Sequence, residues 1–153
     1  MKLQSQLIIP TVEKGRLRVA FATSDGLTVN EHFGWGRQFV LYDVSKEGAR
    51  KAGKIVFDAK DLDERGNDDK LAAKIEALRG CHIVYAEAIG GPAAARLTRE
   101  RMQPMVVKDE NDVAKLLEQI KNVLNQPSMP PWLRKLTRDD DPARFENFDV
   151  EDY

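Results

Sequence analysis

The sequence predicts an α/β fold, and two changes of hydrophobic pattern along the chain carry that prediction. Between residues 16 and 58, short apolar runs are joined by short links that contain turn residues, which is typical of strands in an antiparallel meander. From residue 67 onward, segments with helical apolar spacing alternate with two more short apolar runs, as in β-α-β units. The expected element order is therefore β-β-β-α-β-α-β-α, followed by a tail.

The first three elements are expected to be strands over residues 16–22, 38–44 and 54–58. The first run begins with alternation and becomes continuously apolar, as a strand that enters a core does. The turn at Ser45-Lys46-Glu47-Gly48 is short enough to make a hairpin of the next two runs.

Three helices and two strands are expected after these. Residues that favour helix caps, helix ends or a 3.6-residue apolar period set their boundaries. The expected segments are a helix that Asn67 caps and Gly80 ends, a strand over 83–86, a helix over 93–102 that follows Gly90-Gly91-Pro92, a strand over 105–107, and a helix that Asp109 caps and the stretch 126–131 ends.

Length and composition indicate one globular domain. The chain has 153 residues, of which 42% are hydrophobic and 32% charged. We expect an N-terminal arm over residues 1–15, a central domain over 16–125, and a tail over 126–153 that is first Pro-rich and then acidic. No run approaches the ~20 apolar residues of a membrane span, and the start does not read as a signal peptide. The single Cys81 suits a reducing compartment, so we expect a cytoplasmic protein without a membrane partner.

Charge is unevenly distributed along the chain. Residues 139–153 contain seven acids and one base and so carry −6, and the other 138 residues carry +5 because the whole chain carries −1. A basic body attracts an anionic ligand. Arg96, Arg99 and Arg101 have no aromatic residues between them, so they indicate a solvated helix face and no nucleic-acid partner.

The loop over residues 29–36, Val-Asn-Glu-His-Phe-Gly-Trp-Gly, is the first candidate for a site, because it places a histidine between two predicted strands. If the first strand is parallel to the fourth, this loop lies beside the Gly90-Gly91 turn, at the end of the sheet where open α/β sheets bind ligands. Cys81 and His82 precede the fourth strand and would lie at the opposite end. We therefore expect Cys81 and His32 not to share a metal.

The residues alone leave the chemistry of this loop open. His32 is either an exposed loop histidine or a ligand, and one histidine makes no closed metal site. The Gly90-Gly91-Pro92 turn is either a tight turn or an anion site at a helix N-terminus. Phe33 and Trp35 are either a pocket wall or ordinary packing. A pre-assembled metal cluster that brings most of its own ligands would need only one or two protein atoms.

Several short motifs, in this order, resemble the dinitrogenase iron–molybdenum cofactor biosynthesis family. They occur over roughly residues 16–135. The matching segments are Arg18 to Asp25, Val29 to Gly34, Phe39 to Tyr42, Asp69-Lys70-Leu71, Leu78 to Cys81, Val84-Tyr85, Ala88 to Gly91, Pro104 and Pro131-Trp132-Leu133.

This resemblance implies a ribonuclease-H-like fold with a mixed five-stranded sheet. It also implies a non-catalytic protein that binds iron–sulfur precursors of the nitrogenase cofactor, including the product of NifB (NifB-co), and exchanges them with the NifEN scaffold. His32 matches the family position thought to hold the cluster, and we expect it to ligate iron. The other residues expected at the site are Ser24, Glu31, Phe33, Gly34, Trp35, Arg37, Gly90 and Gly91.

Two other function classes remain open. One is an adaptor for assembly proteins that uses the tail from residue 130, with Trp132, Phe145, Phe148 and Tyr153 as anchors. The other is a metal-dependent nuclease-like enzyme. That enzyme would need a cluster of carboxylates, and only Asp25 and Glu87 are near the expected site.

Overall fold

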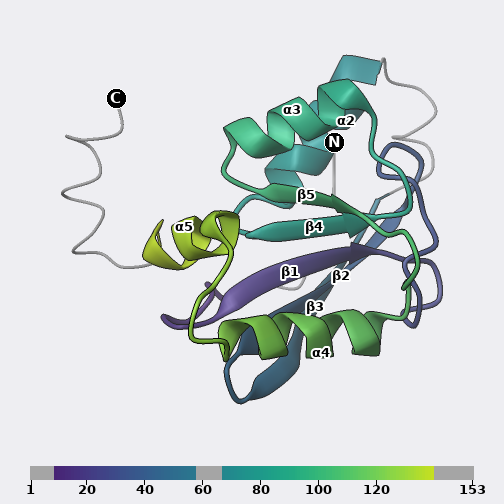
Figure 1. Ribbon diagram of the computed structural model, residues 1–153. Helices are drawn as coiled ribbons and strands as arrows, with labels where there is room; N and C mark the ends of the chain where they lie inside the picture. Colours follow the sequence, from purple (N-terminus) through teal and green to yellow (C-terminus); the bar gives the residue numbers. More distant parts are fainter. Residues whose placement is uncertain (1–8, 58–66, 140–153) are drawn as a thin grey trace, which may run out of the picture.

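A computed structural model of the chain describes residues 9–57 and 67–139, and it confirms an α/β fold with a mixed five-stranded sheet (Figure 1). The strand order is β3-β2-β1-β4-β5. The first three strands form antiparallel pairs, and β1, β4 and β5 run parallel. The strands are β1 (Leu17–Ala22), β2 (Gln38–Ser45), β3 (Gly48–Val56), β4 (Ile83–Ala86) and β5 (Gln103–Val106).

Helices cover both faces of the sheet. On one face lie α2 (Asn67–Ala77) and α3 (Gly91–Arg99), and on the other lies α4 (Val113–Leu124) (Figure 1). A further helix, α5 (Pro131–Asp139), follows at one end of the sheet. Among the described residues, no helix has the length and the apolar composition that crossing a membrane requires.

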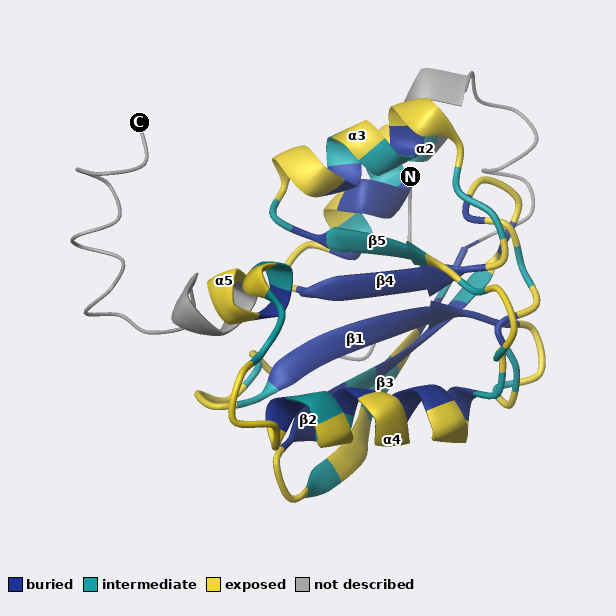
Figure 2. Ribbon diagram, in the orientation of Figure 1, coloured by how far each residue is buried: buried dark blue, intermediate teal, exposed yellow. Residues whose placement is uncertain are grey.

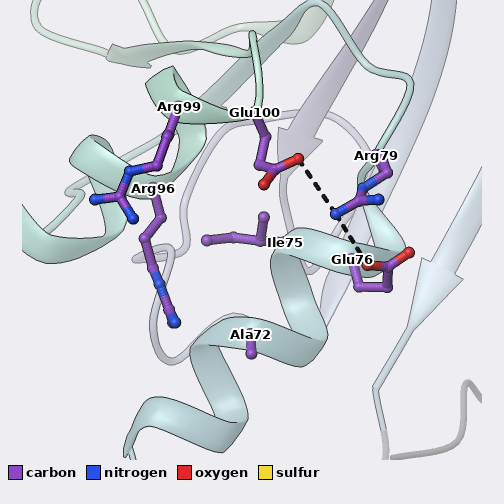
Figure 3. A pocket seen from close by; sticks show the side chains of 7 residues that line it. All are labelled: Ala72, Ile75, Glu76, Arg79, Arg96, Arg99 and Glu100. Atoms are coloured by element: carbon purple, nitrogen blue, oxygen red, sulfur yellow. Dashed lines mark ion pairs between the residues drawn. The ribbon is translucent and has the colours of Figure 1, made fainter.

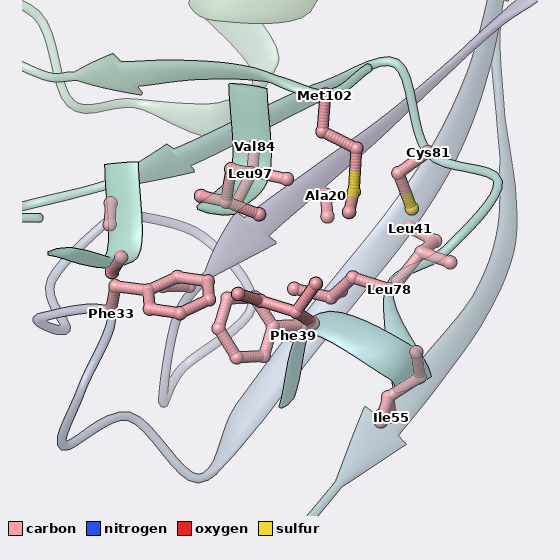
Figure 4. Packing of buried hydrophobic residues seen from close by; sticks show 14 of the residues in the cluster. Ala20, Phe33, Phe39, Leu41, Ile55, Leu78, Cys81, Val84, Leu97 and Met102 are labelled. Atoms are coloured by element: carbon pink, nitrogen blue, oxygen red, sulfur yellow. The ribbon is translucent and has the colours of Figure 1, made fainter. Parts of the chain in front are cut away.

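Two hydrophobic clusters fill the space between these layers. In β1, Leu17, Val19 and Phe21 point to α4, and Ala20 and Ala22 point to α2 and α3, because successive side chains of a strand alternate between faces. All six residues of β1 are buried, as expected for a central strand covered on both sides (Figure 2). The cluster on the α2–α3 side, the first core cluster, is drawn in Figure 4. The cluster on the α4 side, the second core cluster, includes Leu133 of α5.

The pairing of β1 with β2 includes a buried ion pair between directly opposed residues. Arg18 donates from Nε and Nη2 to the two carboxylate oxygens of Asp43, at 2.7 Å and 2.9 Å. Both side chains are more than nine-tenths buried. The hydrogen bond with Asp43 raises the pKa of Arg18 above its usual value, because it favours the charged guanidinium.

Several expected boundaries are wrong, and local interactions explain them. The third strand begins at Gly48 instead of residue 54. The extra residue Ala52 makes a bulge in β3, opposite Leu41 and Tyr42 of β2, and interrupts the alternation that the sequence analysis relied on. The helix expected over 93–102 is α3, which starts at Gly91 and stops at Arg99. The last expected strand, over 105–107, is β5 and starts at Gln103.

A Schellman motif ends α3. The amide of Met102 donates to the carbonyl of Leu97 at 2.8 Å, and the amide of Arg101 donates to the carbonyl of Thr98 at 3.0 Å. Arg101 takes the left-handed conformation that this motif requires, with a φ of 67°. Met102 and Leu97 are both buried in the first core cluster, which is the apolar contact typical of the motif.

Two caps and one helix also differ from expectation. Asp112, and not Asp109, caps α4, and its carboxylate accepts a hydrogen bond from the amide of Lys115 at 3.2 Å. Asn67 lies inside α2 as its first helical residue instead of preceding it. The sequence analysis did not expect α5, which falls in the segment assigned to the tail.

Replacing Asp43 with Ala should lower the free energy of unfolding by about 3–5 kcal/mol, because the Arg18 guanidinium would stay buried without its partner. The double variant Arg18→Met with Asp43→Leu should regain most of that loss, since it leaves no buried charge. Urea denaturation of the three proteins measures both effects. Equal losses in the single and double variants would show that the pair is not the source of the stability.

Candidate ligand-binding site

The loop between β1 and β2, residues 23–37, lies at the carboxyl end of the parallel strands, next to the segment that follows β4. His32 and Ala88 form a parallel bridge. The amide of Phe33 donates to the carbonyl of Ala88 at 2.8 Å, and the amide of Glu87 donates to the carbonyl of Glu31 at 2.8 Å. The prediction that the His32 loop lies beside the segment after the fourth strand is therefore confirmed.

A buried lysine of α2 binds the second half of this loop. The ammonium of Lys74 donates to the carbonyls of Phe33, Gly34 and Gly36 at 2.7, 2.8 and 2.7 Å. Its Nζ also lies 5.9 Å from the centre of the Phe33 ring, and Lys74 is only 1% exposed. An ammonium has three donors, so the three carbonyls can satisfy all of them.

The sequence analysis missed Lys74, although its position carried a signal. Leu71, Ile75 and Leu78 mark the inward face of α2, and Lys74 is adjacent to Leu71 and Leu78 on that face, at spacings of three and four. A lysine on the apolar stripe of a helix is rarely fully buried without partners. That placement predicts a nearby cluster of acceptors, which here is the backbone of the loop.

A tight turn closes the loop around His32. The amide of Gly36 donates to the carbonyl of His32 at 2.8 Å. A Cβ atom at Gly36 would lie 2.9 Å from that same oxygen, which is closer than real side chains approach. The turn therefore requires glycine at position 36.

The first half of the loop is held by the carboxylate of Asp25. Its Oδ1 accepts hydrogen bonds from the amides of Leu27 and Thr28 at 2.8 and 2.9 Å, and from the hydroxyl of Thr23 at 3.0 Å. These bonds, those from Thr28 and Leu27 most of all, lower the pKa of Asp25 from 3.8 to about 2. Asp25 is thus a structural group of the loop.

The structure shows a pocket beside the loop, between α2 and α3. It has a volume of about 250 Å³. Its wall is mostly apolar and comprises Gly34, Trp35, Leu71, Lys74, Gly90, Pro92 and Ala93. Trp35 is 74% exposed, so it forms an outer wall that solvent reaches. The N-terminus of α3 opens at this pocket, and no side chain of the described residues caps it.

The residues expected at the site divide into three groups. Gly34, Trp35 and Gly90 line the pocket together, and Gly91 adjoins it as the first residue of α3. The residues of the next group are not part of the pocket wall. The Nε2 of His32 lies 3.6 Å from the Oε1 of Glu87, with both side chains half-exposed. The side chain of Asn30 accepts a hydrogen bond from the Ser24 amide and donates one to the Ser24 hydroxyl. Arg37, which is exposed, and Glu31, which is half-buried, lie outside the pocket wall.

Phe33 forms the third group, because it belongs to the core. It is fully buried and packs edge-to-face on Phe39, with ring centres 5.7 Å apart. The sequence left open whether Phe33 and Trp35 form a pocket wall or pack in the core. Phe33 packs in the core, and Trp35 forms part of the pocket wall. What Phe33 contributes to the loop is its backbone carbonyl, which accepts from Lys74.

Cys81 and His82 lie at the other end of the sheet, as predicted. The Nδ1 of His82 accepts a hydrogen bond from the amide of Arg18 at 2.9 Å, near the start of β1. Burial raises the pKa of the Cys81 thiol to about 12, which suppresses the thiolate that binds metals. Within residues 9–57 and 67–139, no group of three or more His, Cys, Asp or Glu side chains is arranged to hold a metal ion.

Replacing Lys74 with Met should lower the free energy of unfolding by roughly 2–5 kcal/mol, because three carbonyls lose a charged donor in a buried place. The loop should loosen, so the amide of Gly36 should exchange its hydrogen faster. Urea denaturation and hydrogen exchange measure these effects. The exposed Lys115→Met variant is the control, with an expected change within about 0.5 kcal/mol. Similar losses in both variants, with unchanged exchange at Gly36, would contradict this role of Lys74.

The Asp25 carboxylate should make the first half of the loop sensitive to acid. Because folding lowers its pKa, its contribution to stability is complete above the ordinary pKa of 3.8 and is lost as the pH falls through about 2. A pH titration followed by NMR should show the Leu27 and Thr28 amide shifts moving with a midpoint near 2. Asp25→Asn should abolish that titration. A midpoint near 3.8 would show that these hydrogen bonds do not hold the carboxylate.

Comparison with known proteins identifies the family. The family described as "dinitrogenase iron-molybdenum cofactor" matches residues 15–123. Protein NifX of Sinorhizobium fredii is 36% identical over 143 residues, which cover 90% of this chain and 88% of that protein. Protein NifX of Rhodobacter capsulatus is 40% identical over 124 residues, which cover 78% of this chain and 77% of that protein.

A solved structure titled "Crystal structure of PH0822" shares the fold. Its TM-score with this chain is 0.52 at 19% identity, over 76% of this chain and 99% of that one. The likeness supports the α/β architecture. The match to the family over most of the chain carries the assignment: the chain belongs to the dinitrogenase iron–molybdenum cofactor family.

Proposed function

We propose that this chain is a non-catalytic carrier that binds iron–sulfur precursors of the nitrogenase iron–molybdenum cofactor. Its cargo would be the product of NifB or a later precursor, which it would receive from NifB and exchange with the NifEN scaffold. Family membership supports the role in cofactor assembly. The observation that favours a carrier is a half-exposed histidine on a loop whose backbone is fixed to the core by Lys74.

His32 is the proposed protein ligand to iron. Structural metal sites usually close around four protein ligands, whereas a cluster that carries its own bridging ligands needs few from the protein. A single imidazole makes an attachment that is reversible, as a carrier requires. The fixed loop lowers the cost of binding, since little backbone order remains to be gained.

Some charges near the site would attract an anionic cargo and others would repel it. The amides of Gly91 and Ala93 lie in the first turn of α3, where the helix dipole favours negative charge, and exposed Arg37 adds a positive charge. Glu31 and Glu87 oppose an anion near His32. The Glu87 carboxylate, 3.6 Å from the imidazole, would instead orient the ring as outer-shell carboxylates do for metal-bound histidines.

The size of the pocket favours partial enclosure of the cargo. Its volume of about 250 Å³ is below the roughly 300–1,000 Å³ of sites that enclose small molecules. A cluster attached to His32 would therefore contact the outer wall at Trp35 and Gly34 and stay open to a receiving protein. This geometry suits transfer between proteins better than long-term storage.

The two rival functions have less support. Trp132, one of the aromatic anchors expected for an adaptor, packs against the second core cluster, and the others lie outside the described residues. Asp25, expected as a carboxylate of a nuclease-like site, is already bound by the amides and hydroxyls of its own loop.

As part of the same proposal we assign the sheet to the ribonuclease-H-like class, from its strand order and directions, and place the protein in the cytoplasm.

Replacing His32 with Ala should weaken binding of purified NifB product at least about tenfold, because the only histidine of the loop is lost. Anaerobic titration followed by visible and EPR spectra measures the affinity and the change at the cluster. Free imidazole should restore part of the spectrum in the variant, because it can enter the vacated position. Wild-type affinity in the variant would remove His32 from the site.

A matched variant separates ligation from orientation. Glu87→Gln keeps the shape of the side chain and removes its charge, so it should alter the spectrum or the pH dependence of binding while binding persists. Lys74→Met serves as the control for loop order, since it leaves His32 in place. If Lys74→Met and His32→Ala weaken binding equally and imidazole rescues neither, the loop acts through its shape and not through the imidazole.

A further inference from the structure

A second pocket lies between α2 and α3, near their C-terminal ends (Figure 3). Its volume is about 220 Å³, and its wall comprises Ala72, Ile75, Glu76, Arg79, Arg96, Arg99 and Glu100. None of these residues lines the pocket beside the His32 loop. We call it the arginine pocket, because three of its seven residues are arginines.

Both acidic side chains of the arginine pocket form ion pairs with Arg79. Arg79 pairs with Glu76 and with Glu100, and both N–O distances are 3.2 Å. Figure 3 shows these two pairs on one side of Ile75, with Arg96 and Arg99 on the other. Among the described residues, neither Arg96 nor Arg99 makes an ion pair. The pocket therefore holds two guanidinium groups whose charge no carboxylate of the described residues offsets.

Arg96 carries the decisive atom. Its Nη1 is buried from solvent and has no hydrogen-bond partner among the described residues. Buried donors in native proteins are nearly always paired, and an unpaired charged donor is costly. Figure 3 shows the Arg96 side chain extending along the groove toward Ala72 of α2, between the two helices. Arg96 is half-buried and lines the pocket, so an acceptor there would satisfy this donor once a small turn of the side chain brought Nη1 to the pocket surface.

A role at the end of the helix accounts for Arg99 but leaves the Nη1 of Arg96 without a hydrogen-bond partner among the described residues. Arginines near a helix C-terminus interact favourably with its dipole and can bond its last carbonyls. Arg99 is exposed in the last turn of α3 and fits that role. The carbonyls of Arg96, Leu97 and Thr98 already accept hydrogen bonds from the amides of Glu100, Arg101 and Met102. Arg96 also lies in the last turn, where its charge suits the helix dipole, but its Nη1 bonds none of these carbonyls.

We propose that the arginine pocket binds an oxyanion, a carboxylate or phosphate group, through Arg96 with support from Arg99. Guanidinium groups match both kinds of oxyanion with paired N–H donors. Its volume of about 220 Å³ is below the roughly 300–1,000 Å³ of sites that enclose small molecules. That space accepts one oxyanion group with some water and is too small for a cofactor. The dipoles at the ends of α2 and α3 oppose an anion, so binding is expected to be weak and salt-sensitive.

Two sources could supply this group, and they share one chemistry. One is a free ion such as inorganic phosphate. The other is a carboxylate of the chain's own acidic segment, because residues 140–153 carry six acids. The proposal does not depend on His32 or on the cargo of the other pocket.

The test is an NMR titration of the full-length protein with inorganic phosphate and, separately, with succinate in low-salt buffer. Saturable shifts should appear in the amides of α2 and α3 near the arginine pocket. Arg96→Gln should weaken them by at least about tenfold, and Arg96→Lys, which keeps the charge but not the planar pair of donors, should weaken them less. The control variant Arg50→Gln removes one positive charge from β3, away from the pocket, and should bind phosphate and succinate as the wild-type protein does.

A full-length variant identifies the source of the oxyanion. In it, the six acids of residues 140–153 are replaced by Asn or Gln. Tighter phosphate binding by this variant that persists at higher salt and is lost when Arg96→Gln is added would show that the chain's own carboxylates compete for the pocket. Unchanged binding would favour a free ion as the ligand. The proposal is overturned if no saturable shift appears in any of these proteins, or if Arg96→Gln and Arg50→Gln bind equally.

Discussion

The arrangement of the candidate site depends on one buried ammonium. Lys74 enters the turn at residues 33–36 and is bound by three backbone carbonyls. A buried charge without such acceptors would be costly, so the loop conformation and the position of α2 stabilise each other. Val29 and Phe33 bury their side chains in the two core clusters, and Lys74 adds the backbone of residues 33–36 to the contacts between the loop and the core.

This arrangement separates the structural and the exposed parts of one short segment. The carbonyls of residues 33, 34 and 36 face inward to Lys74, and the amides of Phe33 and Gly36 are bonded as well. The side chains of His32 and Trp35 are left on the outside. A rigid backbone that presents few exposed side chains is the usual construction of a binding loop. The loop can therefore offer His32 to a ligand without depending on that ligand for its own order.

The sequence predicted the relations that follow from topology and missed those that depend on a single contact. His32 was placed beside the segment after β4 because parallel strands bring their carboxyl ends together. Lys74 was missed because a lysine in a helix is read as a surface residue. Asp109 and Asp112 are both residue types that cap helices. Asp112 is the cap in the structure, where it also forms a β-bridge with Thr28, a contact that local sequence does not predict.

Lys74 and Arg96 show how the same groove can hold a structural cation and a candidate binding group. Both lie between α2 and α3, and both bury a donor nitrogen. The Lys74 ammonium has an acceptor from the chain for each of its three donors, so it needs nothing further. The Nη1 of Arg96 has none among the described residues, and the nearby carboxylates are taken by Arg79. Both side chains are cations, so they differ in their partners and not in their charge. Because burial makes an unpaired donor costly, Arg96 is the one of the two that a ligand would stabilise.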